Sequence, residues 1–430
     1  MTPSAMSRER IFTVDAMPLK YGHGALAELG GDVAALGPRR VAVFTDRHLA
    51  ATEHAAIALA ALKGAGLDVA LYDQVRVEPN EASFREAGAF ARNGRFDGFV
   101  SLGGGSVIDT CKVANLLATH GDDLIAYVNA PLGGGVAPPG PLKPHLACPT
   151  TCGTGSEMTA TAVFDLTSAN VKTGIAHRVL KPTRAVVDPT TTYTLPVGVV
   201  CATGLDVLTH AIESWTARPF TARDRPADPG ARPPYQGANP WSDIGAFKAI
   251  ELGGAFLERA YADATDHEAR DGLMFAATLA GMAFGNAGVH IPHAMSYAVA
   301  GLNHSFVAAG YEDEPPMVPH GISVVVNAPA ALRFTVPACP ERHLRAAEAL
   351  GADVEGLSPD LGGKALSDRL AEIMRNTGCP NGLTALGYTE ADVPALVRGA
   401  WPQKRLLVQA PRAPSEADLA DIFRAALRVW

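Results

Sequence analysis

The sequence predicts an α/β domain over residues 1–190, followed by an all-helical domain over residues 191–430. Three observations support this prediction. A chain of 430 residues is too long for one simple core, so two domains are expected. The first part alternates short β-branched runs with Ala- and Leu-rich runs, which is typical of a parallel sheet covered by helices. Beyond residues 186–196 strand-like runs almost vanish and helical periodicity takes over.

Four strands are expected in the first domain. The first, VAVFTD (41–46), ends in polar residues, and LDVALYD (67–73) is the second. The third, FDGFVSLGGGS (96–106), runs into a glycine turn, and a helix over VIDTCKVANLLAT (107–119) follows at once. The fourth, HLACPTT (145–151), again ends in small polar residues. This alternation of strand and helix favours a parallel arrangement.

Helical patterns dominate the second domain. Its helices are expected at 204–217, 242–262 and 267–287. Two long loops interrupt it: one over 218–240, rich in Pro, Gly and Arg, and one over 303–319. Loops of this length in a compact domain are usually functional or mobile.

The composition excludes several classes of function. Hydrophobic residues make up 47% and charged residues 19%, and the formal net charge is −8 with no Lys/Arg run, so nucleic acid is not an expected partner. The apolar runs are broken well short of the roughly 20 residues that a membrane span needs. The N-terminal MTPSAMSRERIF has no apolar segment after its charges, so we expect a bacterial-type cytoplasmic enzyme. The six cysteines form no zinc-type C-x2-C pairs and are expected to be buried small hydrophobes.

A glycine turn after the third strand is the first candidate binding site. Gly103, Gly104, Gly105 and Ser106 lead into a helix whose first turn carries Asp109. Glycine lets the backbone approach a phosphate closely, and the positive end of the helix favours an anion. The alternative is a tight turn that binds nothing.

Two further segments end near the same edge of the predicted sheet. Asp46 lies at the carboxyl end of the first strand, where a carboxylate accepts both ribose hydroxyls and repels a 2′-phosphate, which favours NAD over NADP. The alternative for Asp46 is an ordinary N-cap. PTTCGTGSE (149–157), dense in hydroxyls and glycines, follows another strand. Because ligands of open parallel sheets bind outside the carboxyl ends of the strands, the three segments together predict a dinucleotide site.

Candidate metal ligands lie in the helical domain. Asp206 and His210 are four residues apart on a predicted helix, so both emerge on one face, although a simple hydrogen-bonded pair has the same spacing. With His293 and His320 they make a donor set suited to Fe(II) or Zn(II) with an open position. Such a metal lowers the pKa of an alcohol, and the alkoxide then gives hydride to a nicotinamide. We expect this reaction in a cleft between the two domains.

The segments SLGGGSVIDTCKVANL, PTTCGTGSE, GLDVLTHAIES, GVHIPHAMSY and VPHGIS resemble, in this order, the iron-containing (group III) alcohol dehydrogenase family. The resemblance covers nearly the whole chain. It implies a Rossmann-like NAD-binding domain and an all-helical metal-binding domain, which together form the dehydroquinate synthase-like fold. It implies that the metal is held by Asp206, His210, His293 and His320. It implies cofactor contacts at Asp46, Asn80, Gly104, Gly105, Ser106, Asp109, Thr150, Thr151, Thr154 and Lys172, of which Asn80 lies in VEPNEASF and departs from the usual PNP-type motif.

Within that family, VRVEPNEASF, PPYQGANPWSDI, FGNAGVHIPHAMSYAVAGL and VPACPERHLRAAEALGAD resemble the hydroxyacid–oxoacid transhydrogenases. These enzymes couple oxidation of a small hydroxy acid such as 4-hydroxybutyrate to reduction of 2-oxoglutarate, with NAD retained. The alternative is an ordinary dehydrogenase that uses free NAD and a simple alcohol or aldehyde. A carboxylated substrate needs a cation, for which Arg218 and the other arginines of 218–240 are candidates. The resemblance also implies a homodimer or a larger homo-oligomer.

Tyr297 takes the position where many family members carry a further histidine near the metal and the nicotinamide. We therefore consider Tyr297 for a proton-relay role, assisted by His290, which is three residues before His293. The alternative is that Tyr297 only packs and that His290 only orients a ligand. The remaining nine histidines are expected at the surface: His23, His48, His54, His120, His145, His177, His267, His304 and His343.

Overall fold

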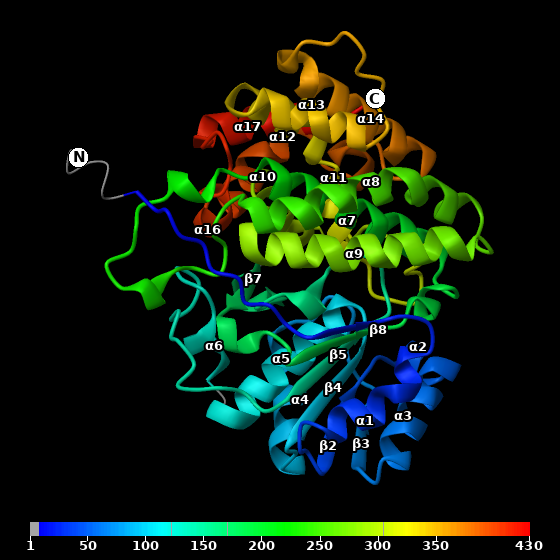
Figure 1. The fold of residues 1–430 in the computed structure, drawn as a ribbon. Helices are drawn as coiled ribbons and strands as arrows, with labels where there is room; N and C mark the ends of the chain where they lie inside the picture. Colours follow the sequence, from blue (N-terminus) through cyan, green and yellow to red (C-terminus); the bar gives the residue numbers. More distant parts are fainter. Residues whose placement is uncertain (1–7, 122, 170, 304) are drawn as a thin grey trace. The chain divides into compact units, whose positions relative to one another are not determined.

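The computed structural model describes residues 8–121, 123–169, 171–303 and 305–430, which form two units (Figure 1). One unit is Ala16–Leu195, and the other joins residues 8–15 to Pro196–Trp430. Residues 1–7, which belong to the N-terminal segment considered above, and His304 lie outside the described residues.

The start of the chain differs from the expected domain 1–190, because residues 8–15 belong to the helical unit. The buried carboxylate of Glu9 accepts a hydrogen bond from Arg232 Nε at 2.9 Å. The Thr13 N–H donates to Gln236 Oε1 at 2.9 Å, and Gln236 Nε2 donates back to the Thr13 carbonyl at 2.9 Å. These partners are 223 residues apart in sequence, so no local pattern could indicate the pairing.

The described part of the first unit contains a parallel sheet of six strands in the spatial order β1-β8-β5-β4-β2-β3. The strands are β1 (Leu19–Tyr21), β2 (Arg40–Phe44), β3 (Asp68–Tyr72), β4 (Gly98–Gly103), β5 (His145–Pro149) and β8 (Arg184–Val187). The chain places β3 on one side of β2 and then returns to place β4 on the other side. Ligands of such sheets bind at this switch point, outside the carboxyl ends of the strands.

Helices cover both faces of the sheet, as Figure 1 shows. Alternate residues of β2 divide between the two faces: Val41 and Val43 pack with α1 and α3, whereas Ala42 and Phe44 pack with α4 and α5. Both faces are therefore dry, which explains the continuous apolar strands. The helices of this unit are α1 (Leu29–Ala34), α2 (Arg47–Ala50), α3 (Glu53–Gly64), α4 (Glu81–Gly94), α5 (Gly105–His120) and α6 (Leu124–Tyr127).

An antiparallel hairpin of β6 (Thr161–Leu166) and β7 (Val171–Ala176) was not anticipated from the sequence. Its Phe164 packs on Phe84 of α4, with the ring centres 5.1 Å apart, and its Ile175 joins the same buried cluster. The hairpin thus packs against α4 and α5, the helices that follow β3 and β4.

The described part of the second unit consists of helices joined by loops and contains no strand of either sheet. Helix α7 is buried along most of its 20 residues, and it packs against α8, α9 and α11. The helices are α7 (Val197–Thr216), α8 (Pro240–Ala262), α9 (His267–Ala287), α10 (Ile291–Leu302), α11 (His320–Val325), α12 (Ala328–Thr335), α13 (Pro340–Ala349), α14 (Gly362–Asn376), α15 (Val393–Ala400), α16 (Lys404–Leu407) and α17 (Glu416–Ala426). The α/β and all-helical division is therefore as predicted.

Among the described residues, α7 is long and apolar enough to cross a membrane, and the bent pair α9 and α10 passes the same test together. Burial inside the protein covers 78% of the apolar window of α7. The core helix of a globular domain has the same property, so length and composition do not identify a span here.

Two histidines expected at the surface are buried instead. His145 on β5 is 3% exposed, and its Nε2 lies 2.8 Å from Ser101 Oγ on β4. His343 on α13 is 0% exposed and shares a hydrogen bond with Thr335. The expectation was wrong for these two because core partners satisfy the neutral imidazoles: Ser101 for His145, and Thr335 with the Cys339 carbonyl for His343.

Candidate metal and cofactor sites

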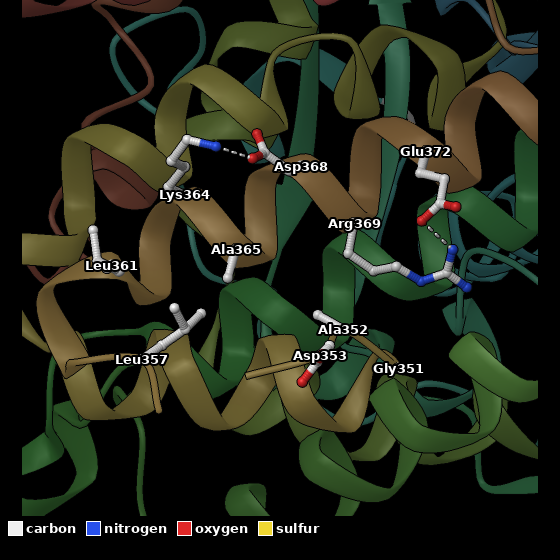
Figure 2. Close-up of a pocket in the computed structure, with 10 residues that line it drawn as sticks. All are labelled: Gly351, Ala352, Asp353, Leu357, Leu361, Lys364, Ala365, Asp368, Arg369 and Glu372. Carbon is white, nitrogen blue, oxygen red and sulfur yellow. Dashed lines mark hydrogen bonds and ion pairs between the residues drawn. The ribbon is translucent and has the colours of Figure 1, made fainter. Parts of the chain in front are cut away.

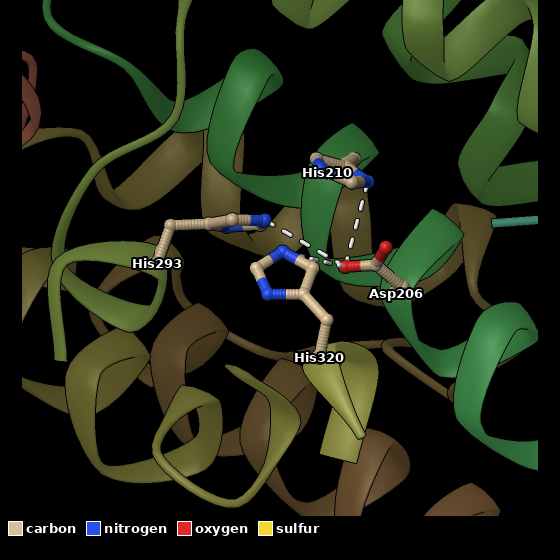
Figure 3. Close-up of side chains that lie close together, drawn as sticks. All are labelled: Asp206, His210, His293 and His320. Atoms are coloured by element: carbon tan, nitrogen blue, oxygen red, sulfur yellow. Dashed lines mark ion pairs between the residues drawn. The ribbon is translucent and has the colours of Figure 1, made fainter. Parts of the chain in front are cut away.

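Four side chains from three helices of the second unit converge on one point (Figure 3). Asp206 and His210 come from α7, His293 from the first turn of α10, and His320 is the first residue of α11. Their ligand atoms all lie within 4.8 Å of one another. The Asp206 Oδ1 atom is 3.6 Å from His210 Nδ1, 3.6 Å from His293 Nε2 and 4.0 Å from His320 Nε2.

These separations suit a divalent metal. Ligand bonds of about 2.1 Å in a tetrahedral arrangement place ligand atoms roughly 3.4 Å apart, so only small movements would close the set around an ion. Asp206 Oδ1, His210 Nδ1 and His293 Nε2 are buried and have no hydrogen-bond partner in the part of the chain that the structure describes. Buried polar atoms are normally satisfied, and three such atoms facing one point fit a metal ion. The donors suit Fe(II) or Zn(II).

Local sequence explains how α7 and α11 meet. Helical spacing places Asp206 and His210 one turn apart on α7. Gly321, next to His320, lies so close to α7 that a Cβ atom there would be 1.9 Å from the Ala202 carbonyl oxygen. Glycine at this position therefore permits the close approach that brings His320 to the site.

Glu213, which the sequence analysis missed, orients His293. It is buried on α7, and its carboxylate pairs with His293 Nδ1. It also accepts the His290 N–H at 2.7 Å and the His293 N–H at 3.3 Å, at the start of α10. A carboxylate on one ring nitrogen leaves the other, Nε2, as the metal donor. The spacing was the available signal, since Glu213 follows Asp206 by seven residues and His210 by three, on one helix face.

The protonation states follow from burial and these carboxylates. Burial lowers the pKa of His210 to about 3, which leaves a neutral imidazole ready to bind a metal at pH 7. Burial also disfavours a charged His293, but the Glu213 and Asp206 carboxylates outweigh it and raise the pKa of His293 to about 9. The pKa of Asp206 is lowered despite its burial, because the histidines surround it. A divalent cation would replace the proton on His293.

We expect Glu213→Gln to weaken metal binding by about 10- to 100-fold, because the neutral amide no longer holds His293 as a carboxylate does. Competition with a chromogenic chelator measures the affinity. The matched control is Glu258→Gln on α8, where the carboxylate pairs with Arg369 and Asn376 away from the four ligands. An unchanged affinity in Glu213→Gln would contradict the orienting role.

The two residues considered for proton relay have other partners in the structure. His290 is fully buried, with Nε2 3.0 Å from Thr216 Oγ1 and Nδ1 accepting the Ile291 N–H at 2.8 Å. Burial lowers the pKa of His290 to about 4, so it is neutral at pH 7. The Tyr297 hydroxyl accepts a hydrogen bond from Arg405 at 2.8 Å. His290 thus holds the start of α10 against the end of α7, through its hydrogen bonds to Ile291 and Thr216.

The glycine turn of the first unit lies where β4 ends and α5 begins. Gly104 is the N-cap of α5, and the helical hydrogen bonds start with Val107 and Ile108 donating to its carbonyl. A Cβ atom on Gly105 would lie 2.6 Å from the Thr154 side chain, and one on Gly104 would lie 3.1 Å from that of Thr151. The turn therefore needs glycine for packing, and it leaves the first N–H groups of α5 at the switch point.

Ser106 and Asp109 are engaged in the first turns of α5. Ser106 Oγ accepts the Glu78 N–H at 3.1 Å. Asp109 is buried and accepts from Ser156 Oγ at 2.5 Å and from the Val163 N–H at 2.8 Å. Asp109 thus joins α5 to Ser156 and to β6 of the hairpin, which is a structural role.

The ends of β2 and β5 flank the turn, as their place beside β4 requires. Asp46 caps α2, with Oδ1 accepting the N–H groups of His48 and Leu49, both at 2.9 Å. Its alternative role as an N-cap is therefore realised. Thr150 and Thr151 follow β5, and Thr150 is buried with its N–H donating to the Gly103 carbonyl at 3.1 Å.

Two other predicted cofactor residues are held by ion pairs or caps. Lys172 on β7 is buried between Glu78 Oε2 at 2.5 Å and Asp165 Oδ1 at 2.9 Å. These carboxylates outweigh burial and raise the pKa of Lys172. Asn80 is the N-cap of α4 and forms a capping box with Ser83. The Glu78–Asn80 segment thus links β6 and β7 to Ser106 at the glycine turn, because Glu78 contacts both Lys172 and Ser106.

A surface pocket elsewhere in the second unit contains none of the four ligands (Figure 2). Four of its charged residues form ion pairs with one another, Lys364 with Asp368 and Arg369 with Glu372. Its lining residues are Gly351, Ala352, Asp353, Leu357, Leu361, Lys364, Ala365, Asp368, Arg369 and Glu372. We assign it no role in the chemistry.

Comparison with known proteins agrees with this organisation. Residues 18–189 match the description "Iron-containing alcohol dehydrogenase", and residues 235–427 match "Fe-containing alcohol dehydrogenase family, C-terminal". The chain is 45% identical over 429 residues to a mitochondrial hydroxyacid-oxoacid transhydrogenase of Xenopus laevis, covering 99% of this chain and 93% of the relative. The protein of the same name from Homo sapiens is 43% identical over 432 residues, covering 100% and 92%.

Solved structures share the fold. A 1,3-propanediol oxidoreductase is 30% identical, with a TM-score of 0.84, covering 97% of this chain and 100% of that one. An alcohol dehydrogenase from Oenococcus oeni is 26% identical, with a TM-score of 0.83 and coverages of 97% and 100%. The predicted fold class is thereby confirmed.

The expected cytoplasmic location is contradicted, because the curated relatives from Xenopus, cattle and human are all named mitochondrial. The expectation was wrong because it was based on the charge and hydropathy of the N-terminal residues, which do not decide the compartment.

Proposed function

The chain belongs to the iron-containing alcohol dehydrogenase family, and from this membership we propose that it transfers hydride from a small hydroxy acid to an oxo acid through NAD. It is a metal-dependent oxidoreductase acting on CH–OH groups. The substrate pair follows the name of relatives that are 43–45% identical over the whole chain. Within that class, 4-hydroxybutyrate and 2-oxoglutarate are the proposed substrates.

The observation that carries the proposal is the convergence of three buried ligand atoms that have no hydrogen-bond partner among the described residues, Asp206 Oδ1, His210 Nδ1 and His293 Nε2. A bound Fe(II) or Zn(II) would supply Lewis acidity, which lowers the pKa of an alcohol and polarises a carbonyl. Asp206 provides the one negative charge among the four ligands. Glu213 adds a second carboxylate next to the site, because it pairs with Nδ1 of His293. The candidate site therefore has one carboxylate ligand, Asp206, and one carboxylate that orients a ligand, Glu213.

In the cofactor unit, we propose that the first N–H groups of α5 bind the pyrophosphate of NAD. Asp46 uses Oδ1 for its two cap bonds, which leaves Oδ2 for a ribose hydroxyl. Lys172 is neutralised by two carboxylates, so we assign it the positioning of Glu78 and the hairpin. This assignment differs from the direct contact that the family resemblance implied.

Turnover without added cofactor tests the proposal. We expect the metal-loaded enzyme to convert 4-hydroxybutyrate and 2-oxoglutarate into succinate semialdehyde and 2-hydroxyglutarate in equal amounts, since one hydride leaves the first substrate and enters the second. Chelation should abolish the reaction, and Fe(II) or Zn(II) should restore it. Chromatographic analysis of both products provides the measurement.

One combination of results would contradict the transhydrogenase proposal. No turnover of this pair, together with brisk oxidation of a simple alcohol once free NAD is supplied, would assign an ordinary alcohol dehydrogenase instead.

A further inference from the structure

Arg405 on α16 is a partly buried cation with no carboxylate partner among the described residues. Its Nη2 donates to the Tyr297 hydroxyl at 2.8 Å, and its guanidinium carbon lies 5.9 Å from the centre of the Tyr235 ring. These two tyrosines account for its interactions within the described residues. A guanidinium removed from water is normally paired with an anion.

Four other arginines of the same unit follow that rule. Arg342 bonds to Asp243 at 2.5 Å, and Arg369 bonds to Glu258 at 2.5 Å. The arginines of the 218–240 loop, considered above for a substrate carboxylate, behave similarly in two cases: Arg232 lies 2.9 Å from Glu9 and Arg223 lies 3.8 Å from it. Arg405 differs from these four in that both of its contacts are neutral phenols.

The two tyrosines place Arg405 beside the helix that carries a metal ligand. Tyr297 follows His293 by four residues on α10, so the two side chains are neighbours on one helix face. Tyr235 is held against the turn that precedes α10, where a Cβ atom on Gly288 would lie 2.9 Å from it. The next residue, Gln236, donates its N–H to the Asn286 carbonyl at 2.7 Å, which fixes that segment.

Building on the proposed function, we propose that Arg405, with the Tyr297 hydroxyl, binds the carboxylate of the hydroxy acid and of the oxo acid in turn. A guanidinium has five N–H donors, so the bond to Tyr297 leaves enough for a bidentate carboxylate. Because Tyr297 accepts from Arg405, its own O–H remains free to donate. Both substrates carry a carboxylate, so one cation serves both halves of the exchange.

This assignment gives Tyr297 a different role from proton relay. Its hydroxyl orients the guanidinium and adds one hydrogen bond to the bound carboxylate. The reacting carbon then lies toward His293 and the charged end toward Arg405.

The test compares NAD reduction by substrates with and without the carboxylate in Arg405→Gln, with free NAD supplied as the hydride acceptor and no oxo acid added, so that only the hydroxy-acid half of the exchange is measured. We expect kcat/KM for 4-hydroxybutyrate to fall roughly 100-fold, mainly through KM, because a charged hydrogen-bonded pair is lost. The value for 1-butanol, which has the same number of carbons and no carboxylate, should change less than about threefold. Arg405→Lys keeps the charge but not the fork and should give an intermediate loss.

Arg412→Gln is the matched control. Arg412 also lies over an aromatic ring, 4.0 Å from the centre of Phe334, and makes one hydrogen bond, to the Phe334 carbonyl at 3.2 Å. Replacing Arg412 should leave kcat/KM unchanged for both 4-hydroxybutyrate and 1-butanol. A thermal melt of each variant identifies any that fails to fold, in which case Arg405→Lys provides the comparison.

Calorimetric titration of the metal-loaded protein with 2-oxoglutarate gives a readout that does not need turnover. Binding should weaken in Arg405→Gln and remain unchanged in Arg412→Gln. Equal losses on 4-hydroxybutyrate and 1-butanol with unchanged 2-oxoglutarate binding would overturn the assignment, as would a selective loss in Arg218→Gln instead. If the wild-type protein binds 2-oxoglutarate through Arg405 but turns over no hydroxy acid, the proposed function fails and the carboxylate site stands.

Discussion

Asp206→Asn is expected to remove the bound metal and to lower kcat by at least about a thousandfold. The Asp206 Oδ1 atom lies within 4.0 Å of a ring nitrogen of each of the three histidines, so it is the common contact of the set. Asparagine keeps the shape but removes the charge that holds a divalent cation in a buried site. Elemental analysis of the purified variant and its kcat under metal saturation are the two measurements.

Asp243→Asn is the control for this substitution. Asp243 is ion-paired with Arg342 and does not belong to the four ligands, so metal content and kcat should stay near the wild-type values. Full metal occupancy in Asp206→Asn would contradict the proposed ligand set.

Gly321→Ala is expected to lower the free energy of unfolding of the helical unit by about 3 kcal/mol and to weaken metal binding. The added Cβ would lie 1.9 Å from the Ala202 carbonyl oxygen and 2.9 Å from the Asp206 Cβ. The Ala202 carbonyl oxygen belongs to the backbone of α7, so it cannot rotate away as the end of a flexible side chain would. Helix α11 must therefore move away from α7, and it takes His320 with it. Urea unfolding followed by circular dichroism, and chelator competition, measure the two effects.

Gly31→Ala controls for the general effect of replacing a helical glycine. Gly31 lies within α1, and a Cβ atom there meets nothing within 4 Å. Alanine should stabilise this helix by about 0.5–1 kcal/mol, because it restricts the unfolded chain. Similar stability changes in the two variants would contradict the close-packing argument for Gly321.

Spacing along one helix accounts for two of the four predicted metal ligands, whereas His293 and His320 were predicted from residue chemistry and the family resemblance. Asp206 and His210 share a face of α7 because four residues make about one helical turn. The same rule applied once more reaches Glu213, which our sequence analysis overlooked although it lies on that face. Its partner His293 is 80 residues away, so the pairing itself depends on how α10 packs on α7.

The cofactor residues show the limit of a motif. Asp46, Asn80 and Asp109 lie in the expected segments, and the structure gives each of them a bond that supports the fold: the first two cap helices and the third binds the hairpin. A motif identifies the segment, whereas only the surrounding packing determines which atoms are already used.

The sequence by itself predicted the two architectures, the strand ends at the switch point and the candidate metal ligands, because each prediction depends on periodicity or on residue chemistry within a short window. Tertiary structure decided which distant groups meet. Glu9 meets Arg232, Glu213 meets His293 and Arg405 meets Tyr297, although these partners are 223, 80 and 108 residues apart in sequence. The physical reason is that helix and strand patterns arise from neighbouring residues, whereas the partners of buried charges are set by the packing of whole elements and leave no local trace.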